Sequence, residues 1–395
     1  MKIAMFAWEA LEGIAVGGGA PYASRLAAAL ARAGHRVRLF TRLGDGQAMD
    51  EAMDGVMIRR CPWDRKPVFC DEIASLSQSF AHYFADSLAT EGSYDVIHCH
   101  DWLTIGAGLG AVAMSNALLA VSFHSTEWGR TGKWPDSGDS ARIAEIERQG
   151  IERADAVIAA SHWAKRKIQE QFHPPEWKCE VVPHGADFPD PAKAAERAVR
   201  VREAAGIAPG APLALFVGRF SRAGGGDLAA RACRLAAERF PGAKFLFVGE
   251  GALESEMRRE AGAAAAFFPS RGRAAAPEFY HAASLVLAPF RRDFSGRAVM
   301  PAWASAKPVA VLKGTVPGEF VLPGKNGWVA AEEEADLARA AEEAFADPET
   351  AAWMGQNGRV AAETAFTWDG GAQKILAAYS RRGALSPAPA AHDAY

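Results

Sequence analysis

The sequence predicts an α/β protein with two doubly wound parallel-sheet domains, and three observations carry this prediction. The chain has 395 residues, more than a single hydrophobic core usually serves. Short apolar runs alternate along it with Ala-rich stretches of helical pattern, which is typical of βαβ units. A Pro-rich break over 183–212 separates two such series, as expected of a boundary between domains.

The first series predicts the N-terminal domain, residues 1–187. Strands are expected at 2–8, 35–42, 94–98, 120–123, 156–159 and 180–182. The loop 9–19 joins the first strand to a helix over 21–33, which Gly34 ends. The regular alternation predicts a parallel sheet covered by helices.

The second series predicts a C-terminal domain over 188–366. Strands are expected at 213–218, 244–249, 264–268, 285–289 and 308–312. A helix at about 367–381 is expected to close the N-terminal domain, and the Pro- and Ala-rich tail 382–395 is expected to be disordered. Two such domains joined by a hinge predict a central ligand cleft, at the carboxyl ends of the strands.

Composition excludes several classes of function. The net charge is −3 and the basic residues are spread along the chain, so no nucleic-acid partner is expected. The five cysteines form no CxxC pair, which favours reduced thiols over disulfides. No secretion signal and no apolar run of about 18 residues occur, so the expected location is cytoplasmic, without a transmembrane segment. The oligomeric state is left open.

Three glycines, Gly17, Gly18 and Gly19, lie between the first strand and the first helix. Glycines let the backbone turn tightly and bring N–H groups close to a ligand. A plain flexible turn is the alternative interpretation. No GxGxxG follows the strand, so a dinucleotide site is not predicted.

Polar residues follow two further strands. The string HCHDW contains His98, His100 and Asp101, and His124 follows the apolar run AVSF. The carboxyl ends of parallel strands are where such folds bind ligands. The first three residues are potential metal ligands, but no second cluster completes a site, so no metal is expected. For Asp101 the alternative is a cap of the next helix.

Six stretches in this order resemble a known family, the retaining GT-B-fold glycosyltransferases of group 1, which include the glycogen and starch synthases. The resemblance runs from Met1 to about Trp368. The stretches are VGGGAPYASRLAAALARAGHRV (16–37), YDVIHCHDW (94–102), VSFHSTEWGRTG (121–132), VIAASHWAKRKI (157–168), VVPHGAD (181–187) and LFVGRFSR (215–222).

The resemblance implies an enzyme that transfers a sugar, with glucose as the expected sugar, from a UDP- or ADP-sugar to a saccharide or other hydroxyl acceptor. It implies no cofactor and no metal, with cations stabilising the leaving diphosphate instead. The implied catalytic residues are His124, Asp101 and Asp293. Gly17, His100 and Glu127 are implied on the acceptor side. Residues implied to bind the donor and its diphosphate are Gly18, Gly19, Arg219, Arg222, Ser295, Gly296, Lys313, Gly314, Thr315 and Glu319.

The donor-side motifs depart from the family pattern. Relatives carry a Lys five residues after the Arg at 219, and this position is Gly224 here. The second of two Glu residues is replaced by Pro301, and the Gly-rich loop reads KGTVPGEF (313–320). Losing one preorganised donor costs on the order of 10²–10³ in rate. A catalytically weakened relative that binds a glycan or a partner protein is therefore a second hypothesis, and a sugar-nucleotide epimerase is a third.

Overall fold

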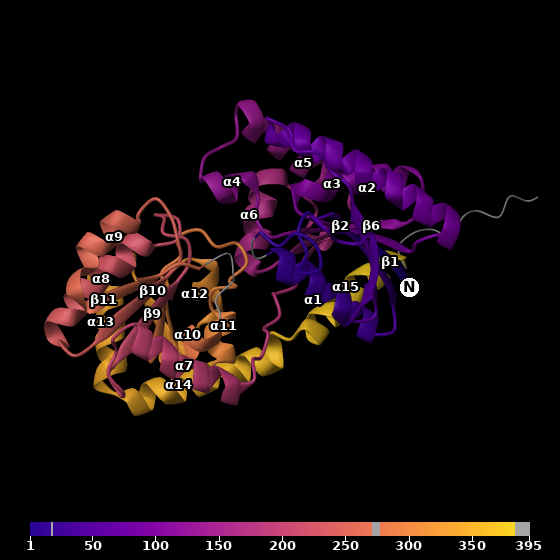
Figure 1. The fold of residues 1–395 in the computed structure, drawn as a ribbon. Helices are drawn as coiled ribbons and strands as arrows, with labels where there is room; N and C mark the ends of the chain where they lie inside the picture. Colours follow the sequence, from indigo (N-terminus) through magenta and orange to yellow (C-terminus); the bar gives the residue numbers. More distant parts are fainter. Residues whose placement is uncertain (17–18, 271–276, 384–395) are drawn as a thin grey trace, which may run out of the picture. The chain divides into compact units, whose positions relative to one another are not determined.

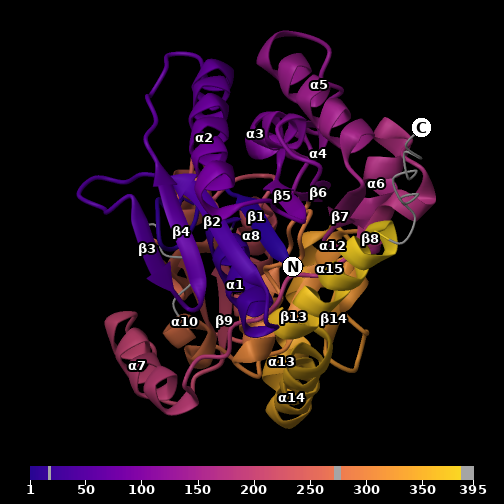
Figure 2. The same cartoon turned by 90° about the vertical axis from the view of Figure 1, so that its right-hand side faces the viewer.

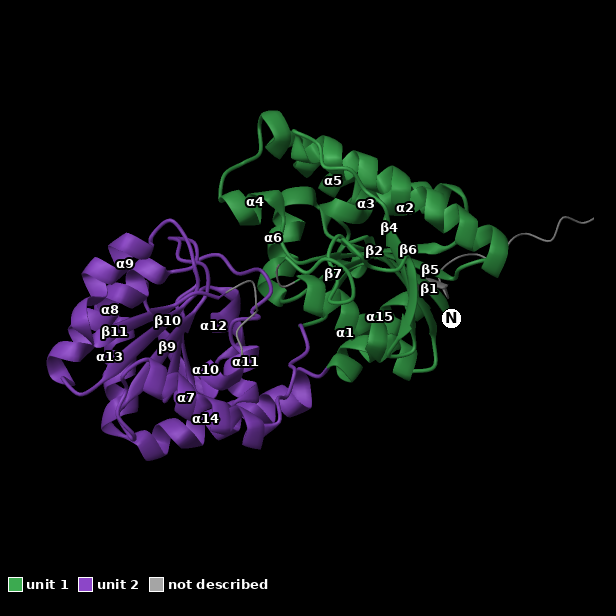
Figure 3. Ribbon diagram, viewed as in Figure 1, with its two compact units in different colours: residues 1–183, 368–395 green, residues 184–367 purple. Residues whose placement is uncertain are grey.

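The computed structural model describes residues 1–16, 19–270 and 277–383. Gly17, Gly18 and the tail from residue 384 onward lie outside the described residues. The chain forms two compact units (Figure 3). Unit 1 consists of Met1–Pro183 with the chain from Trp368 onward, and unit 2 of His184–Thr367.

In the described part of unit 1, eight strands form one sheet in the order β3-β4-β2-β1-β5-β6-β7-β8. The strands are β1 (Lys2–Phe6), β2 (Arg36–Arg42), β3 (Asp50–Met53), β4 (Val56–Cys61), β5 (Val96–His100), β6 (Leu118–Phe123), β7 (Ala156–Ala159) and β8 (Cys179–Val181). All neighbours pair in parallel except β3 with β4. The chain winds outward in both directions from β1 and β5, so the switch point of this sheet lies between them.

Helices cover both faces of this sheet (Figures 1 and 2). On one face lie α1 (Gly19–Arg32) and α15 (Trp368–Gly383), which share a core with β1, β5, β6 and β7. Helix α15 buries Ala372, Ile375, Leu376 and Tyr379, a spacing that places them on one helical face. The opposite face carries α2 (Phe69–Glu91), whose Phe80 ring stacks 5.7 Å from the ring of Phe6, together with α3 (Trp102–Ala113) and α5 (Gly138–Arg153).

The remaining helical segments of unit 1 lie between β6 and β8 in the sequence. They are α4 (Glu127–Thr131), α6 (His162–Phe172) and the 3-10 turn η1 (Glu176–Lys178). The strands predicted from the sequence are present with small displacements of their ends, whereas β3 and β4 were not predicted.

Unit 2 has a six-stranded parallel sheet in its described part, ordered β11-β10-β9-β12-β13-β14. The strands are β9 (Leu213–Val217), β10 (Lys244–Val248), β11 (Ala265–Phe268), β12 (Leu285–Ala288), β13 (Val309–Leu312) and β14 (Gly327–Ala330). Its switch point lies between β9 and β12. These two sheets confirm the predicted fold class, although β14 was not predicted.

Two cores flank the sheet of unit 2. The helices α8 (Gly226–Arg239) and α13 (Glu334–Ala346) pack on one face. On the other face lie α7 (Pro191–Ala204), α10 (Pro277–Ala282), α11 (Met300–Ala304) and α14 (Pro348–Ala365) around the buried indole of Trp303. The unit also contains α9 (Glu254–Ala261), η2 (Gly262–Ala264) and α12 (Val316–Phe320). No helix within the described residues combines the length and the apolar character needed to cross a bilayer.

Candidate functional site

The switch point of unit 1 brings the predicted histidines together. Strand β5 continues through His100, so His98 and His100 are strand residues on one face of the sheet. In the register with β6, His100 pairs with Ser122, and His124 follows just beyond the end of that strand. Asp101 is the first residue after β5. His100, Asp101 and His124 therefore lie at the carboxyl ends of two adjacent strands, and His98 lies two residues deeper in β5.

Asp101 ties these two strand ends together. Its backbone has φ of 57°, in the left-handed region that a residue with a side chain rarely adopts. Its Oδ1 accepts hydrogen bonds from the backbone N–H of His124, at 2.7 Å, and of Ser125, at 3.4 Å. Asp101 does occupy the N-cap position of α3, and its carbonyl oxygen accepts from the Thr104 N–H at 3.2 Å, but its side chain makes no cap hydrogen bond to that helix. Asp101 instead fixes the backbone that carries His124.

His98 and His100 are buried, and His124 is only partly exposed. Nδ1 of His98 lies 2.7 Å from the Tyr379 hydroxyl, and its Nε2 lies 2.8 Å from Ser122 Oγ. Nδ1 of His100 lies 3.3 Å from Nε2 of His124. Burial lowers the pKa of His100 to about 3, so this imidazole is neutral at pH 7. Of the three rings, that of His124 is the one at the strand edge with partial solvent access.

The metal alternative finds no support at this edge. Within the ranges that the structure describes, no group of three or more His, Cys, Asp or Glu side chains is arranged to hold a metal ion. Both ring nitrogens of His98 already have protein partners, Tyr379 and Ser122.

Glu127, expected on the acceptor side, is turned into the protein. Its carboxylate accepts two hydrogen bonds from Arg130, at 2.8 and 2.6 Å, and one from Ser140. Its backbone N–H donates to Glu147 of α5, at 2.8 Å. Glu127 therefore attaches α4 to α5. Glu147, which the sequence did not single out, is also buried, and burial raises its pKa to about 9.

The first residue of α1 already has an anionic partner. Glu9 Oε1 accepts from the Gly19 N–H and Oε2 from the Val16 N–H, both at 2.8 Å. A Cβ on Gly19 would stand 2.6 Å from Glu9 Oε1. A carboxylate near the first turn complements the helix dipole. The Gly19 N–H, predicted to contact the donor, is thus bound within unit 1.

In unit 2 two exposed cations lie at the carboxyl edge of the sheet. Arg219 follows β9 and Lys313 directly follows β13. Both side chains are exposed, and neither has a hydrogen-bond or ion-pair partner among the described residues. Strand β12 lies between β9 and β13, so the loop after β12 lies between these two positions. Arg219 stands at the switch point itself.

The loop after β12 contains Asp293, Ser295 and Gly296. Asp293 Oδ1 accepts from the Ser295 N–H at 2.8 Å, the Ser295 hydroxyl at 2.9 Å and the Gly296 N–H at 2.9 Å. Gly296 has φ of 66°, and a Cβ there would stand 2.2 Å from the Phe320 ring. Asp293 therefore organises its own turn through one oxygen. Pro301, at the position of the family's second Glu, lies in the short helix α11.

The loop that follows β13 ends in a capped turn. Thr315 is the N-cap of α12, and its hydroxyl accepts from the Gly318 N–H at 3.3 Å. Gly314, before it, has φ of 77°. Glu319 is exposed on α12, and its backbone N–H donates to the Thr315 carbonyl at 3.1 Å. The predicted donor-loop residues thus form one compact turn beside Lys313.

The position of the family's Lys is closed to a side chain. A Cβ on Gly224 would stand 2.5 Å from the carbonyl oxygen of Arg219. Arg222, expected to bind the donor diphosphate, is mostly exposed and lies 3.5 Å from Asp227. Asp227 is 2% exposed and is bound by Arg291, at 2.6 and 3.2 Å. Burial alone would raise the pKa of Asp227, but the guanidinium of Arg291 holds it below its usual value. Sequence reasoning missed Arg291, although it precedes the Asp293 motif closely.

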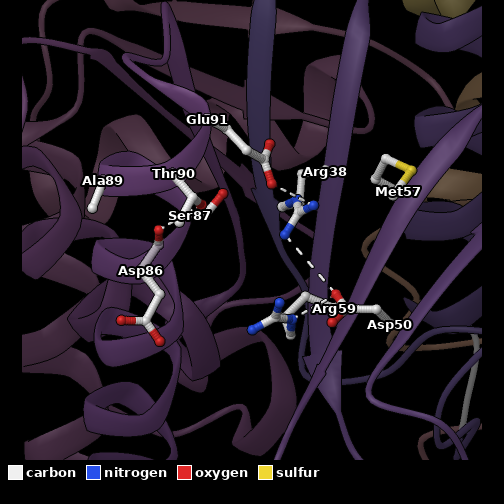
Figure 4. A pocket seen from close by; sticks show the side chains of 9 residues that line it. All are labelled: Arg38, Asp50, Met57, Arg59, Asp86, Ser87, Ala89, Thr90 and Glu91. Atoms are coloured by element: carbon white, nitrogen blue, oxygen red, sulfur yellow. Dashed lines mark hydrogen bonds and ion pairs between the residues drawn. The ribbon is translucent and has the colours of Figure 1, made fainter.

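A surface pocket in unit 1 lies away from the carboxyl edge of its own sheet (Figure 4). It is lined by residues of β2, β3, β4 and the end of α2, among them Arg38, Arg59, Asp50 and Glu91. Arg38 forms an ion pair with Glu91 at 2.5 Å, and Arg59 with Asp50 at 2.7 Å. Because these charges neutralise one another, the pocket offers no unpaired cation of the kind found at Arg219.

Two family models match the chain, one on each unit. The Glycosyl transferase 4-like domain matches residues 17–185, and Glycosyl transferases group 1 matches residues 200–361. Together they span all the strands named above except β1, which precedes the first matched range.

Relatives align with nearly the whole chain. An uncharacterized glycosyltransferase of Methanocaldococcus jannaschii is 27% identical over 390 residues, which cover 96% of this chain and 98% of that protein. The glycogen synthase of Mycobacterium tuberculosis is 24% identical over 412 residues, with 98% and 97% covered.

Solved structures share the fold at low identity. Sucrose-phosphate synthase from Thermosynechococcus elongatus superposes with a TM-score of 0.78 at 22% identity, covering 98% of this chain and 100% of that one. Anabaena HepE in complex with UDP-glucose has a TM-score of 0.71 at 18% identity, with 96% and 100% covered. With the two family models and the relatives, these findings show that the chain belongs to the group 1 glycosyltransferases of GT-B fold and is a sugar-transferring enzyme.

Proposed function

We propose that this enzyme transfers glucose, with retention of the anomeric configuration, from UDP- or ADP-glucose to a hydroxyl group of a saccharide. Unit 2 binds the nucleotide-sugar and unit 1 binds the acceptor. The Mycobacterium tuberculosis relative is named a glycogen synthase, and the Anabaena structure contains UDP-glucose; both support this choice of donor. His124 contacts the reacting sugar, Asp101 holds its backbone, and no metal takes part.

The observation that carries the proposal is the exposure of the Arg219 side chain at the edge of the sheet in unit 2. Its guanidinium is exposed at the switch point of unit 2 and has no protein partner among the described residues. Arg222 and Arg291, by contrast, are paired with the buried carboxylate of Asp227. A leaving diphosphate develops negative charge that positioned cations stabilise. Arg219, with Lys313 at the same edge of the sheet, supplies such cations.

Calorimetric titration with UDP, ADP and GDP tests this assignment. The wild-type protein should bind one of the three in the micromolar range. The Arg219→Ala variant should bind that nucleotide about 10- to 100-fold more weakly, because a charge-assisted hydrogen bond contributes about 1.5–3 kcal/mol. Arg200→Ala is the matched control, since Arg200 is exposed on α7 and forms an ion pair with Glu196 on the same helix. Equal affinities in the wild type and Arg219→Ala would refute the role of Arg219.

Product analysis tests the reaction itself. The nucleotide that binds identifies the glucose donor to incubate with oligosaccharide acceptors, and proton NMR of the first product gives the anomer. Retention predicts an α-linked product from an α-linked donor. Release of nucleotide with a β-linked product contradicts retention. An isomerised sugar nucleotide without transfer would identify an epimerase instead.

A second function is favoured by one specific observation: the loop around Gly224 has no space for the family's Lys, and Pro301 offers no carboxylate. A weakened relative that binds a glycan or a protein would fit these replacements. It predicts no heat with any nucleotide, together with saturable binding to a glycan in an array or in calorimetry. The two titrations therefore separate the two functions.

A further inference from the structure

Three imidazole rings are stacked in unit 1 along the direction of β5. The ring centroids of His98 and His100 are 4.6 Å apart, and those of His100 and His124 are 5.6 Å apart with an interplanar angle of 3°. Tyr22 of α1 packs edge-on against His124, at 4.4 Å between centroids. The stack therefore leads from the core of unit 1 to the strand edge at which His124 lies.

The inner end of this stack is fully hydrogen-bonded. The Tyr379 hydroxyl of α15 and the Ser122 hydroxyl of β6 each contact one nitrogen of His98, at 2.7 and 2.8 Å. Neither side chain is exposed. These two contacts fix the position of the His98 ring, and His100 lies between this ring and that of His124 in the stack.

The nitrogens of His100 are in unequal surroundings. Nδ1 lies 3.3 Å from Nε2 of His124, whereas Nε2 is buried and has no hydrogen-bond partner within the described residues. Neutral His100 carries one proton, on one of these two atoms. A proton on Nε2 would leave a buried N–H without an acceptor, which is rarer in proteins than an under-satisfied acceptor. The proton therefore belongs on Nδ1, from which it is donated to His124.

We infer that His100 is a positioning residue, whose Nδ1–H fixes Nε2 of His124 as an acceptor, so that neutral His124 carries its proton on Nδ1. This inference rests on the proposed function, in which His124 contacts the reacting sugar. Nδ1–H of His124 then acts as a hydrogen-bond donor to a sugar oxygen. His100 itself, expected on the acceptor side, acts through His124 rather than by touching a substrate.

The tautomer is measured directly on the resting full-length protein by nitrogen-15 NMR with labelled histidine. Protonated and bare imidazole nitrogens have separate shifts, and the signals of His124 are assigned by their loss in His124→Ala. The expected result is the Nδ1–H tautomer in the wild type and a mixture of tautomers in His100→Phe, which keeps a ring in the stack but has no donor. His82→Phe is the control, because His82 is exposed on α2.

Kinetics provide the second readout once a donor is known. His100→Phe should lower kcat about tenfold with KM for the nucleotide-sugar unchanged, the loss expected for one hydrogen bond. His100→Asn should restore most of kcat, because its amide nitrogen stands as far from the backbone as Nδ1 does. A merely structural role predicts equal losses in both variants and no change of tautomer.

Two results would overturn the inference: an Nε2–H tautomer of His124 in the wild type, or a tautomer that His100→Phe leaves unchanged. If His100→Phe fails to fold, the tautomer of the wild type and the kinetics of the His100→Asn variant still test the inference. Failure of the proposed function is distinguishable, because it would appear as absent nucleotide binding while the NMR result stands.

Discussion

Replacing Glu147 by Gln should remove a pH dependence from the stability of unit 1. Glu147 is 1% exposed, and its Oε1 accepts the backbone N–H of Glu127 at 2.8 Å. Its Oε2 has no partner in the described part of the chain. Burial raises the pKa of this carboxyl to about 9; the charges of Asp101 and Glu127 add to the rise, and Arg130 opposes it. The acid is therefore protonated at neutral pH in the folded protein.

The sign and size of the effect follow from proton linkage. The unfolded chain releases this proton near pH 4.5, whereas the folded chain keeps it up to about pH 9. Between these values the folded state binds one proton more, so the free energy of unfolding falls by about 1.4 kcal/mol for each pH unit gained. From pH 6 to pH 8 the loss is on the order of 3 kcal/mol. Gln does not titrate, so the Glu147→Gln variant should lack this slope.

Urea unfolding at pH 6, 7 and 8, followed by tryptophan fluorescence and circular dichroism, measures the slope for the transition of unit 1. The control is Glu145→Gln on the same helix. Hydrogen bonding to Arg148 lowers the pKa of the exposed Glu145 to about 2, so this group is ionised throughout that range and its variant should keep the wild-type slope. A Glu147→Gln variant with the wild-type slope would refute the reasoning.

Two further predictions concern unit 2. Gly224→Lys should not tighten nucleotide binding and should lower the free energy of unfolding by about 1–3 kcal/mol, because its Cβ would stand 2.5 Å from the Arg219 carbonyl oxygen. Calorimetry and urea unfolding measure both effects, and a gain in affinity would contradict the prediction. Arg291→Ala should destabilise unit 2 by about 3 kcal/mol in urea unfolding, because it leaves the buried carboxylate of Asp227 poorly paired. Arg234→Ala, exposed on α8, should change stability little, and equal effects of the two variants would contradict the prediction.

Most of the strands could be located from the sequence pattern, because buried parallel strands are continuous apolar runs. The exceptions have physical reasons. Strand β3, with the sequence DEAM, is largely exposed and of low β-propensity. It forms by antiparallel pairing with β4 at the edge of the sheet, a tertiary effect that the local sequence does not reveal. Strand β14 is short and begins at Gly327.

The candidate site was only partly predictable. Strand ends locate His124, Asp101 and Arg219, because topology alone brings them to a sheet edge. The partners of a side chain depend on distant elements, and this is where sequence reasoning fails. Glu127 is bound by Ser140 and lies against Glu147, both on another helix. A side chain is excluded at position 224 because its Cβ would collide with the Arg219 carbonyl oxygen.

Helix α15 has a consequence for the order in which the protein is synthesised. It covers the same face of the first sheet as α1 and supplies Ile375 and Tyr379 to that core, yet the ribosome makes it only after unit 2. At about 5–20 residues per second, residues 184–367 take roughly 10 to 40 s to synthesise. During this interval the newly made first unit exposes an apolar face and His98 lacks Tyr379. The last helix thus completes the fold of the first unit, and we expect chaperones to bind nascent chains in which this helix has not yet been made.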